Sequence, residues 1–124
     1  MGILFITHNL AVVAEIADRV AVMYGGRIVE DAPVAAILDA PRHPYTAGLI
    51  RSVPRTDHAA RAAGRRDRLV AIPGGMVDPR FPPPGCDFNP RCSFSTADCR
   101  AAVPPLITAG RDRHVRCIRW NEVS

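Results

Sequence analysis

The sequence has 124 residues and a net charge of +4, and all 16 of its basic residues are arginine. A phosphate-binding loop of the form G-x-x-x-x-G-K-[S/T] needs a lysine, so this sequence excludes one. No apolar run approaches the ~20 residues that span a bilayer, and the N-terminal residues lack the basic and apolar regions of a signal peptide. An intracellular chain with reduced thiols is therefore expected, in which four cysteines are more typical of metal ligands than of disulfides.

The charge is unevenly distributed between the two halves of the chain. Residues 1–54 carry four arginines against five acidic residues, whereas residues 55–124 carry twelve arginines against seven. A basic half can bind nucleic acid or a membrane surface, but few aromatic residues are interleaved with these arginines, as a stacking platform would require. We therefore interpret the second half as a solvated basic segment and expect no nucleic-acid partner.

The first residues predict a buried strand followed by a helix. Residues 3–6 form a continuous apolar run, as expected of a parallel strand covered on both faces, and His8 follows at its carboxyl end. Ligands bind at the carboxyl ends of strands in open α/β sheets. Asn9 or Thr7 is suited to cap the next helix, because its side-chain oxygen can accept a backbone N–H. Apolar residues then recur at helical spacing, at Leu10, Val13, Ile16 and Ala17.

A hairpin and two short helices are predicted next. Residues 20–24 and 27–30 are typical of strands, and the Gly25-Gly26 pair between them supplies the positive φ angles of a tight turn. Residues 33–38 predict a short amphipathic helix. A second helix is predicted to begin at Pro44, a residue suited to the first helical position, with Tyr45 as its anchor.

The remaining residues contain little regular structure by sequence. Residues 55–68 are rich in alanine and arginine and predict a linker, because they have little apolar surface to bury. Residues 69–72 are a candidate strand. Residues 82–84 are three consecutive prolines, which predict a stiff polyproline-II piece.

Four cysteines in the last third of the chain form a candidate metal site. They follow the pattern C-x5-C-x6-C-x17-C, at Cys86, Cys92, Cys99 and Cys117. Because there is no C-x2-C pair, a zinc ribbon or knuckle is disfavoured. Four thiolates suit zinc or an iron–sulfur cluster, and the spacing alone leaves iron–sulfur, zinc and no metal open. His114 could substitute for one of these ligands, but with four cysteines available we interpret it as a surface residue. The nearby arginines either neutralise such a site or are solvated; they are Arg91, Arg100, Arg113 and Arg116.

The region around His8 resembles the switch-histidine region of ABC-transporter ATPases. The matching residues are Ile6-Thr7-His8, Leu10, Val13, Ala17-Asp18-Arg19-Val20, Val22-Met23 and Gly26-Arg27-Ile28-Val29-Glu30. In that family the matching histidine contacts the γ-phosphate of ATP, so the resemblance implies a catalytic role for His8. Asn9 is a departure, because the family usually has aspartate there. Asparagine keeps the capping role but removes a negative charge.

Two later segments resemble the oligopeptide/dipeptide (and nickel) branch of the same family. The segment Arg42-His43-Pro44-Tyr45-Thr46 resembles the motif that defines this branch, and we interpret it as a docking helix without chemistry. Residues 72–74 and 85–117 resemble the C-terminal extension of these proteins. In that family four cysteines are implicated in holding a [4Fe-4S] cluster, so the resemblance implies that all four cysteines are its ligands. We favour a structural role, because small segments with few apolar residues often need such a staple.

The resemblance covers nearly the whole chain. It implies an α/β fold that is the C-terminal remnant of a P-loop ABC ATPase domain (strand, helix, hairpin, helix), followed by a small irregular extension. Residues 1–40 are expected to end the nucleotide-binding domain, 41–54 to form the docking helix, 55–68 the linker and 69–124 the cysteine-rich extension. The residue 3–6 strand would lack sheet neighbours, which predicts weak folding or self-association of residues 1–40.

The same resemblance implies the setting in which the chain works. The whole subunit would bind ATP and Mg²⁺, pair with a second ATPase subunit and with transmembrane permease subunits, and lie on the cytoplasmic face of the membrane. The phosphate loop, the signature and the catalytic glutamate are absent, so we expect no ATP hydrolysis by this chain alone. The alternative is a small basic metal-binding interaction module or redox-sensing module.

Overall fold

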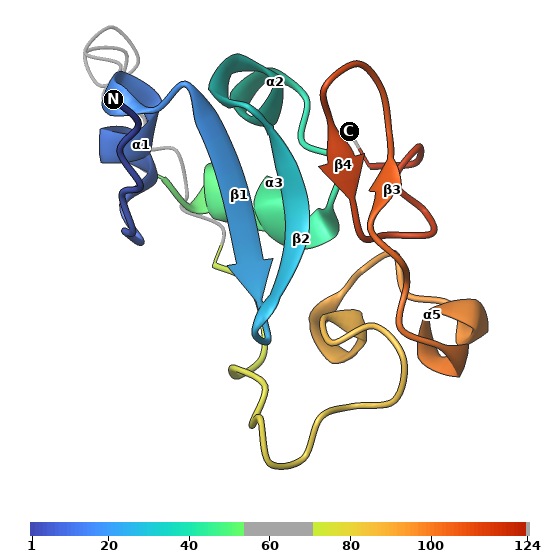
Figure 1. The fold of residues 1–124 in the computed structure, drawn as a ribbon. Helices are drawn as coiled ribbons and strands as arrows, with labels where there is room; N and C mark the ends of the chain where they lie inside the picture. Colours follow the sequence, from blue (N-terminus) through green and yellow to red (C-terminus); the bar gives the residue numbers. More distant parts are fainter. Residues whose placement is uncertain (54–70, 124) are drawn as a thin grey trace, which may run out of the picture.

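A four-stranded antiparallel sheet joins the two halves of the chain in the computed structural model, which describes residues 1–53 and 71–123 (Figure 1). Strands β1 (Arg19–Tyr24) and β2 (Arg27–Pro33) form the hairpin, and the short strands β4 (His114–Val115) and β3 (Ile107–Thr108) extend the sheet in the order β1-β2-β4-β3. The α/β class is confirmed. The two tail strands were not predicted, because two-residue strands carry too little periodicity to recognise.

The hairpin forms where the glycine pair predicts it. Gly25 and Gly26 both have positive φ angles, 59° and 78°, which match the turn that joins closely paired antiparallel strands. The register shifts between Val22 and Met23, so the strands contain an irregularity near their tip. Val22 and Tyr24 are buried while Ala21 and Met23 are exposed, and this alternation places one face of β1 against the core.

Three helices accompany the hairpin. Helix α1 (Leu10–Ile16) begins as predicted at Asn9, whose side-chain oxygen accepts the backbone N–H of Ala11 at 3.0 Å. Helix α2 (Val34–Asp39) follows β2 directly and buries Ile37 completely. Helix α3 (Pro44–Ser52) starts at the predicted proline and lies behind the hairpin (Figure 1).

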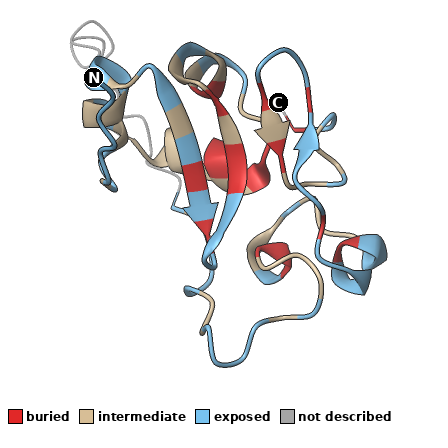
Figure 2. Cartoon of the chain, in the orientation of Figure 1, coloured by how far each residue is buried: buried red, intermediate tan, exposed pale blue. Residues whose placement is uncertain are grey.

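The core consists of one face of the hairpin, helix α3 and an aromatic residue from the cysteine segment. Val22, Tyr24, Val29 and Phe88 form the buried cluster, and Tyr45 of α3 packs against it. The Tyr24 ring lies 4.6 Å from the Tyr45 ring and 5.2 Å from the Phe88 ring, centroid to centroid. Such aromatic contacts add to the stabilisation from apolar burial. Figure 2 shows this buried zone along the hairpin and α3.

The predicted strand at residues 3–6 is wrong for this structure. These residues form no strand, and Ile3, Leu4 and Ile6 are 81%, 88% and 88% exposed. A strand needs neighbours that accept and donate its backbone hydrogen bonds. Within residues 1–53 and 71–123 the only sheet is the one described above, and residues 3–6 do not pair with it. His8 therefore does not lie at a strand end.

The cysteine segment, residues 85–117, is largely irregular, and its part before β3 wraps past the end of the hairpin (Figure 1). Besides β3 and β4, its regular pieces are the 3-10 helix η1 (Asn89–Arg91) and the short helix α5 (Ala97–Ala101). Of the candidate strand at 69–72 only residues 71–72 are described, and they form no strand. The predicted linker at 55–68 lies outside the described residues. No helix in the described ranges has the length and apolar character needed to cross a membrane.

Candidate cysteine site

All four cysteines line one small cavity of about 20 Å³. Cys86 and Cys92 flank η1, Cys99 lies in α5 and Cys117 follows β4. Each is a free cysteine; Cys99 is buried and the other three are half-buried. The structure therefore brings together residues that the sequence separates by up to 31 positions.

Backbone contacts fix the first three cysteines relative to one another. The Cys86 N–H donates to the Cys99 carbonyl at 2.8 Å. The buried Asn89 amide donates to the carbonyls of Pro84 and Cys86, at 2.7 and 2.8 Å. Gly85 has a φ of +74°, and a Cβ there would lie 2.2 Å from the Cys99 carbonyl oxygen. Only glycine permits this approach. Asn89 and Gly85 were not singled out as positioning residues by sequence, because their partners are backbone atoms.

The cavity opposes ionisation of the Cys86, Cys92 and Cys117 thiols. Burial raises the pKa of Cys86 and of Cys92, and raises the pKa of Cys117 to about 11. Backbone N–H groups act in the opposite direction, and the Arg119 N–H donates to the Cys117 sulfur at 3.4 Å. The neighbouring thiols raise the pKa of Cys117 further. A thiol with a raised pKa is protonated at neutral pH, so a metal has to displace its proton, whereas the N–H donors stabilise the resulting thiolate.

Three of the four predicted arginines bind backbone carbonyls and connect the tail to the first half of the chain. Arg91 donates to Pro73 O at 2.8 Å and to the Tyr24 hydroxyl at 3.3 Å. Arg113 donates to Ala36 O. Arg116 donates to Ile28 O and Pro104 O, both at 2.9 Å. These arginines are therefore neither simply solvated nor aimed at the sulfurs.

Arg100 and Arg119 are the two other arginines to be placed relative to the cavity. Arg100 is exposed on α5. Arg119, which the sequence analysis did not select, lines the cavity, and its side chain pairs with Glu122. Its position two residues after Cys117 in the sequence was the available signal.

His43 is a second cavity residue whose role the sequence did not reveal. It is 1% exposed, and its Nδ1 accepts the Tyr45 N–H at 3.1 Å, which caps α3. Burial lowers the pKa of His43 to about 4. The imidazole is thus neutral at physiological pH. The fully buried Glu30 carboxylate accepts the backbone N–H groups of Arg42 and His43, at 2.8 and 2.9 Å.

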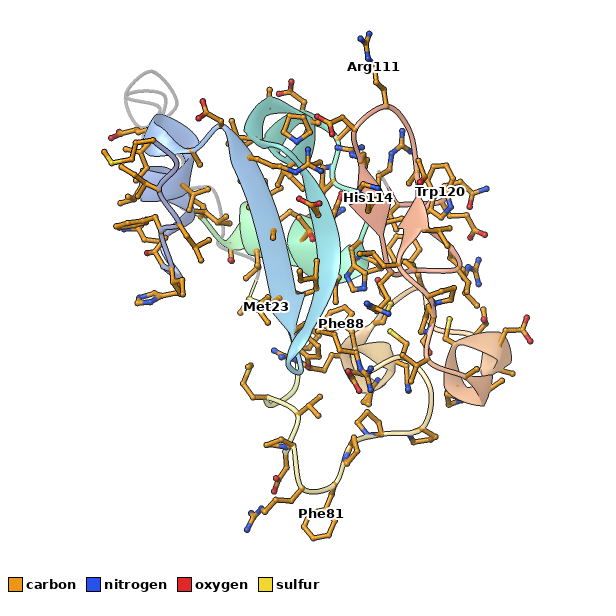
Figure 3. All side chains as sticks on the ribbon, viewed as in Figure 1. Met23, Phe81, Phe88, Arg111, His114 and Trp120 are labelled. Carbon is orange, nitrogen blue, oxygen red and sulfur yellow. The ribbon has the colours of Figure 1, made fainter. Side chains whose placement is uncertain are left out.

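The other candidate residues lie apart from this cavity. His114 sits on β4 (Figure 3), where its Nδ1 is 3.6 Å from Asp31. It is not among the residues that line the cavity. His8 is exposed in the irregular segment before α1. The neighbouring Asn9 N–H donates to the Thr7 hydroxyl at 3.1 Å, so a local turn shapes this segment.

The donor set fits a metal centre in composition but not as a closed single-ion site. Within residues 1–53 and 71–123, no group of three or more His, Cys, Asp or Glu side chains is arranged to hold a metal ion. A tetrahedral zinc site draws its sulfurs to about 2.3 Å from one ion. Four thiols nevertheless line one cavity, and the Arg119 N–H donates to the sulfur of Cys117.

Comparison with known proteins assigns the class of protein to which this chain belongs. A family model described as "Oligopeptide/dipeptide transporter, C-terminal region" matches residues 29–99, from the hairpin to the third cysteine. The chain belongs to this family. The match spans the Arg42-His43-Pro44-Tyr45 motif, which the sequence analysis used as the diagnostic segment.

Individual relatives agree with this assignment over the full chain. A protein of Brucella melitensis named as a peptide import ATP-binding protein is 53% identical over all 124 residues, which are 37% of its own length. The oligopeptide transport ATP-binding protein OppD of Mycobacterium tuberculosis is 47% identical over 99% of this chain and 19% of its own length. AppD of Bacillus subtilis, named as an oligopeptide transport ATP-binding protein, is 46% identical over 98% of this chain and 35% of its own length. The chain thus spans little more than a third of these relatives, or less.

Proposed function

We propose that the chain acts as the C-terminal part of the ATP-binding subunit of a peptide-importing ABC transporter. The observation that carries this proposal is identity of about half over the entire chain to proteins named for peptide import and ATP binding. The partners would be a homologous second ATPase subunit and transmembrane permease subunits, with the assembly on the cytoplasmic face of the membrane. ATP and Mg²⁺ would be bound by the whole subunit rather than by these 124 residues.

His8 is proposed to contact the γ-phosphate of ATP in the assembled subunit. Its exposure next to the N-terminus of α1 leaves the imidazole free to face a nucleotide, and a donor at that position stabilises developing charge on the phosphoryl group. The sequence holds no lysine, so the chain alone is expected to hydrolyse no ATP. ATP turnover by the purified chain that disappears in His8→Ala would contradict this expectation.

A chimera tests the transporter assignment directly. This chain would replace the matching part of the Brucella melitensis relative, and ATP hydrolysis and peptide uptake would be measured. Activity close to that of the intact relative is expected, with a loss on the order of 100-fold in His8→Ala. Asn9→Asp is the matched control, because it restores the family's usual residue and keeps the helix cap. A folded chimera without ATP hydrolysis would overturn the assignment, and an active His8→Ala chimera would overturn the role of His8.

We further propose that Cys86, Cys92, Cys99 and Cys117 hold a [4Fe-4S] cluster, with a structural zinc as the alternative. Convergence of all four thiols on one cavity supports four ligands. Such a cluster would supply a rigid crosslink between η1, α5 and the segment after β4, in a tail with few buried apolar side chains. The residues of the chain contribute thiolates, N–H donors to sulfur and exclusion of water.

Metal analysis of anaerobically purified protein tests this site. A broad visible absorption band with about four iron and four sulfide per chain is expected, and it should be lost in each Cys→Ser variant. Ser93→Ala is the control, because Ser93 is exposed beside Cys92. One zinc per chain without colour would replace the cluster by structural zinc. A folded chain with neither metal would overturn the metal proposal and leave the transporter assignment untouched.

A further inference from the structure

The cysteine cavity contains a buried hydroxyl that has no hydrogen-bond partner among the described residues. This hydroxyl is the Oγ of Ser95, which lines the cavity together with all four cysteines. The part of the chain that the structure describes has three other buried side-chain atoms of this kind, and none belongs to a residue of the cavity: Arg42 Nε, Thr46 Oγ1 and Arg113 Nε. A buried hydroxyl without a partner costs free energy, so its presence beside the cysteines calls for an explanation.

Backbone hydrogen bonds fix Ser95 between two of the cysteines. The Ser95 N–H donates to the Cys92 carbonyl at 3.3 Å. The next residue, Thr96, accepts the Cys99 N–H at its carbonyl at 3.1 Å, and its hydroxyl lies 3.5 Å from the Cys99 sulfur. The hydroxyl of Ser95 is therefore held in the turn that joins these two cysteines, and it can rotate to meet an acceptor there.

The acceptors around this hydroxyl change in strength when the cysteines bind a metal. A protonated thiol is only a weak hydrogen-bond acceptor. Metal binding removes the thiol protons and leaves sulfur atoms that carry negative charge. A hydrogen bond to a charged acceptor is roughly twice as strong as one between neutral groups. The Ser95 hydroxyl therefore gains a strong acceptor only when the cysteines are ionised by metal.

We propose that the Ser95 hydroxyl is a hydrogen-bond donor to a sulfur of the metal-loaded cysteine site, and that it stabilises the loaded chain relative to the metal-free chain. This inference rests on the proposed metal site. It gives a residue that is not a ligand a role in metal retention, as partners of ligands often have. For an iron–sulfur cluster it also gives Ser95 a role in the reduction potential, because a donor to sulfur favours the more negative, reduced state.

The substitution Ser95→Ala should act differently on the two forms of the chain. In the metal-free chain it removes a hydroxyl without a partner, so the free energy of unfolding should stay the same or increase. In the loaded chain it removes a hydrogen bond to a charged sulfur, so metal should be lost about 5-fold faster. Ser93→Ala is the matched control, because Ser93 is exposed and does not line the cavity, and it should change neither quantity.

The measurement uses the full 124-residue chain, loaded anaerobically with ferrous iron and sulfide in one sample and with zinc in another. Metal loss to a chelator would be followed by the decrease in visible absorption for iron and with a coloured indicator for zinc. Urea unfolding of the metal-free proteins gives the second quantity. If the chain holds a cluster, a redox titration should also give a lower reduction potential for Ser95→Ala than for Ser93→Ala.

The outcomes separate this inference from the metal proposal. Faster metal loss in Ser95→Ala than in Ser93→Ala, without destabilisation of the metal-free chain, supports the inference. Equal rates of metal loss would overturn it and leave the metal site in place. A metal-free chain that Ser95→Ala destabilises more than Ser93→Ala would also overturn it, because the hydroxyl would then have a partner without metal. A native chain that takes up neither iron nor zinc would overturn the inference together with the metal proposal.

Discussion

Residues 1–9 and the cysteine segment are both irregular, yet only the cysteine segment is held in place. Residues 3–6 carry four large apolar side chains that remain 58% to 88% exposed. The cysteine segment has a lower proportion of large apolar residues, but Phe88 is 3% exposed. The carbonyls, amides and arginines of this segment bind one another and the hairpin. Apolar composition alone therefore does not order a segment, whereas a set of hydrogen bonds to a formed hairpin does.

The contrast between these two segments also separates parts of residues 1–40, which the sequence analysis treated as one unit. Residues 1–40 were expected to fold weakly as a unit, but β1, β2 and α2 are part of the core and their burial involves Phe88 and Val115 of the tail. Residues 1–6 are all exposed, and α1 contains no buried residue. Weak folding is thus expected for the first residues, and the hairpin is expected to unfold together with the cysteine segment.

Gly85→Ala should reduce the free energy of unfolding more than any other change considered, because its added Cβ would clash with the backbone of the cysteine segment. The added Cβ would meet the Cys99 carbonyl oxygen at 2.2 Å, and Gly85 also has a positive φ of 74°. We expect the free energy of unfolding to fall by about 3 kcal/mol or more, as the sum of overpacking and backbone strain. Urea unfolding of the metal-free chain measures it.

Gly26→Ala is the matched control for that experiment. Gly26 has a similar φ of 78° but nothing within 4 Å of the added Cβ. It should therefore cost only the backbone strain, about 1 kcal/mol. Losses of equal size in the two variants would show that the Gly85–Cys99 approach contributes nothing beyond its φ angle.

Glu30→Gln should have the next largest effect, because it removes a buried charge that holds the start of α3. The carboxylate accepts two backbone N–H groups and lies 4.0 Å from the buried Arg113 guanidinium. An amide would present its own N–H to one of those donors and leave Arg113 without a counter-charge, so we expect a loss of about 2–3 kcal/mol. Thermal or urea unfolding gives the value.

Glu122→Gln controls for the loss of a negative charge in general. Glu122 pairs with Arg119 at the surface, and its removal should change the free energy of unfolding by less than about 0.5 kcal/mol. A Glu30→Gln variant as stable as Glu122→Gln would mean that Glu30 does not organise the helix start.

His43 should make the stability of the metal-free chain depend on pH. Burial lowers its pKa from 6.5 to about 4, so between these values the unfolded chain binds the additional proton. The stabilisation is fully present above about pH 7 and falls as the pH decreases through 6.5 towards 4. We expect a loss of about 2 kcal/mol between pH 7 and pH 5, from the conversion of 1.36 kcal/mol per pKa unit.

His43→Gln removes the titrating group and should flatten this part of the pH profile, whereas His114→Gln should leave it unchanged. His114 is the suitable control because it lies on β4, is only half-buried and does not line the cavity. A slope between pH 7 and pH 5 that persists in His43→Gln would assign the pH dependence to another group.

Local signals in the sequence predicted the parts of the fold that local chemistry decides. Gly25-Gly26 marks the hairpin turn, Asn9 caps α1 and Pro44 begins α3, and each needs only its near neighbours in the chain. The strand at residues 3–6 was predicted from apolar character, but a strand also needs pairing partners, which the described residues do not provide. Propensity without a neighbour does not make a sheet.

In the candidate site, too, features set by residue type could be predicted, whereas contacts with distant parts of the chain could not. The four cysteines could be selected by residue type, but spacing could not show that Cys117 returns to the cavity from β4. Nor could it reveal that Arg91 and Arg116 bind carbonyls of residues 73 and 28, because those acceptors have no sequence signature. His43 was visible only as part of a diagnostic motif, since the cysteines with which it lines the cavity come from the other half of the chain.

Phe5→Ser tests the exposed N-terminal segment, residues 1–9, and should have the smallest effect on the free energy of unfolding. Phe5 is 58% exposed, so the free energy of unfolding should change by less than about 0.5 kcal/mol, whereas Val115→Ala, at 0% exposure, should cost about 1–2 kcal/mol. Self-association should respond in the opposite order, because exposed apolar residues promote contacts between chains. Sedimentation velocity should show fewer oligomers for Phe5→Ser than for the native chain. A marked loss of stability in Phe5→Ser would instead mean that residues 3–6 pack onto the fold in solution, and the contrast between the two irregular segments would disappear.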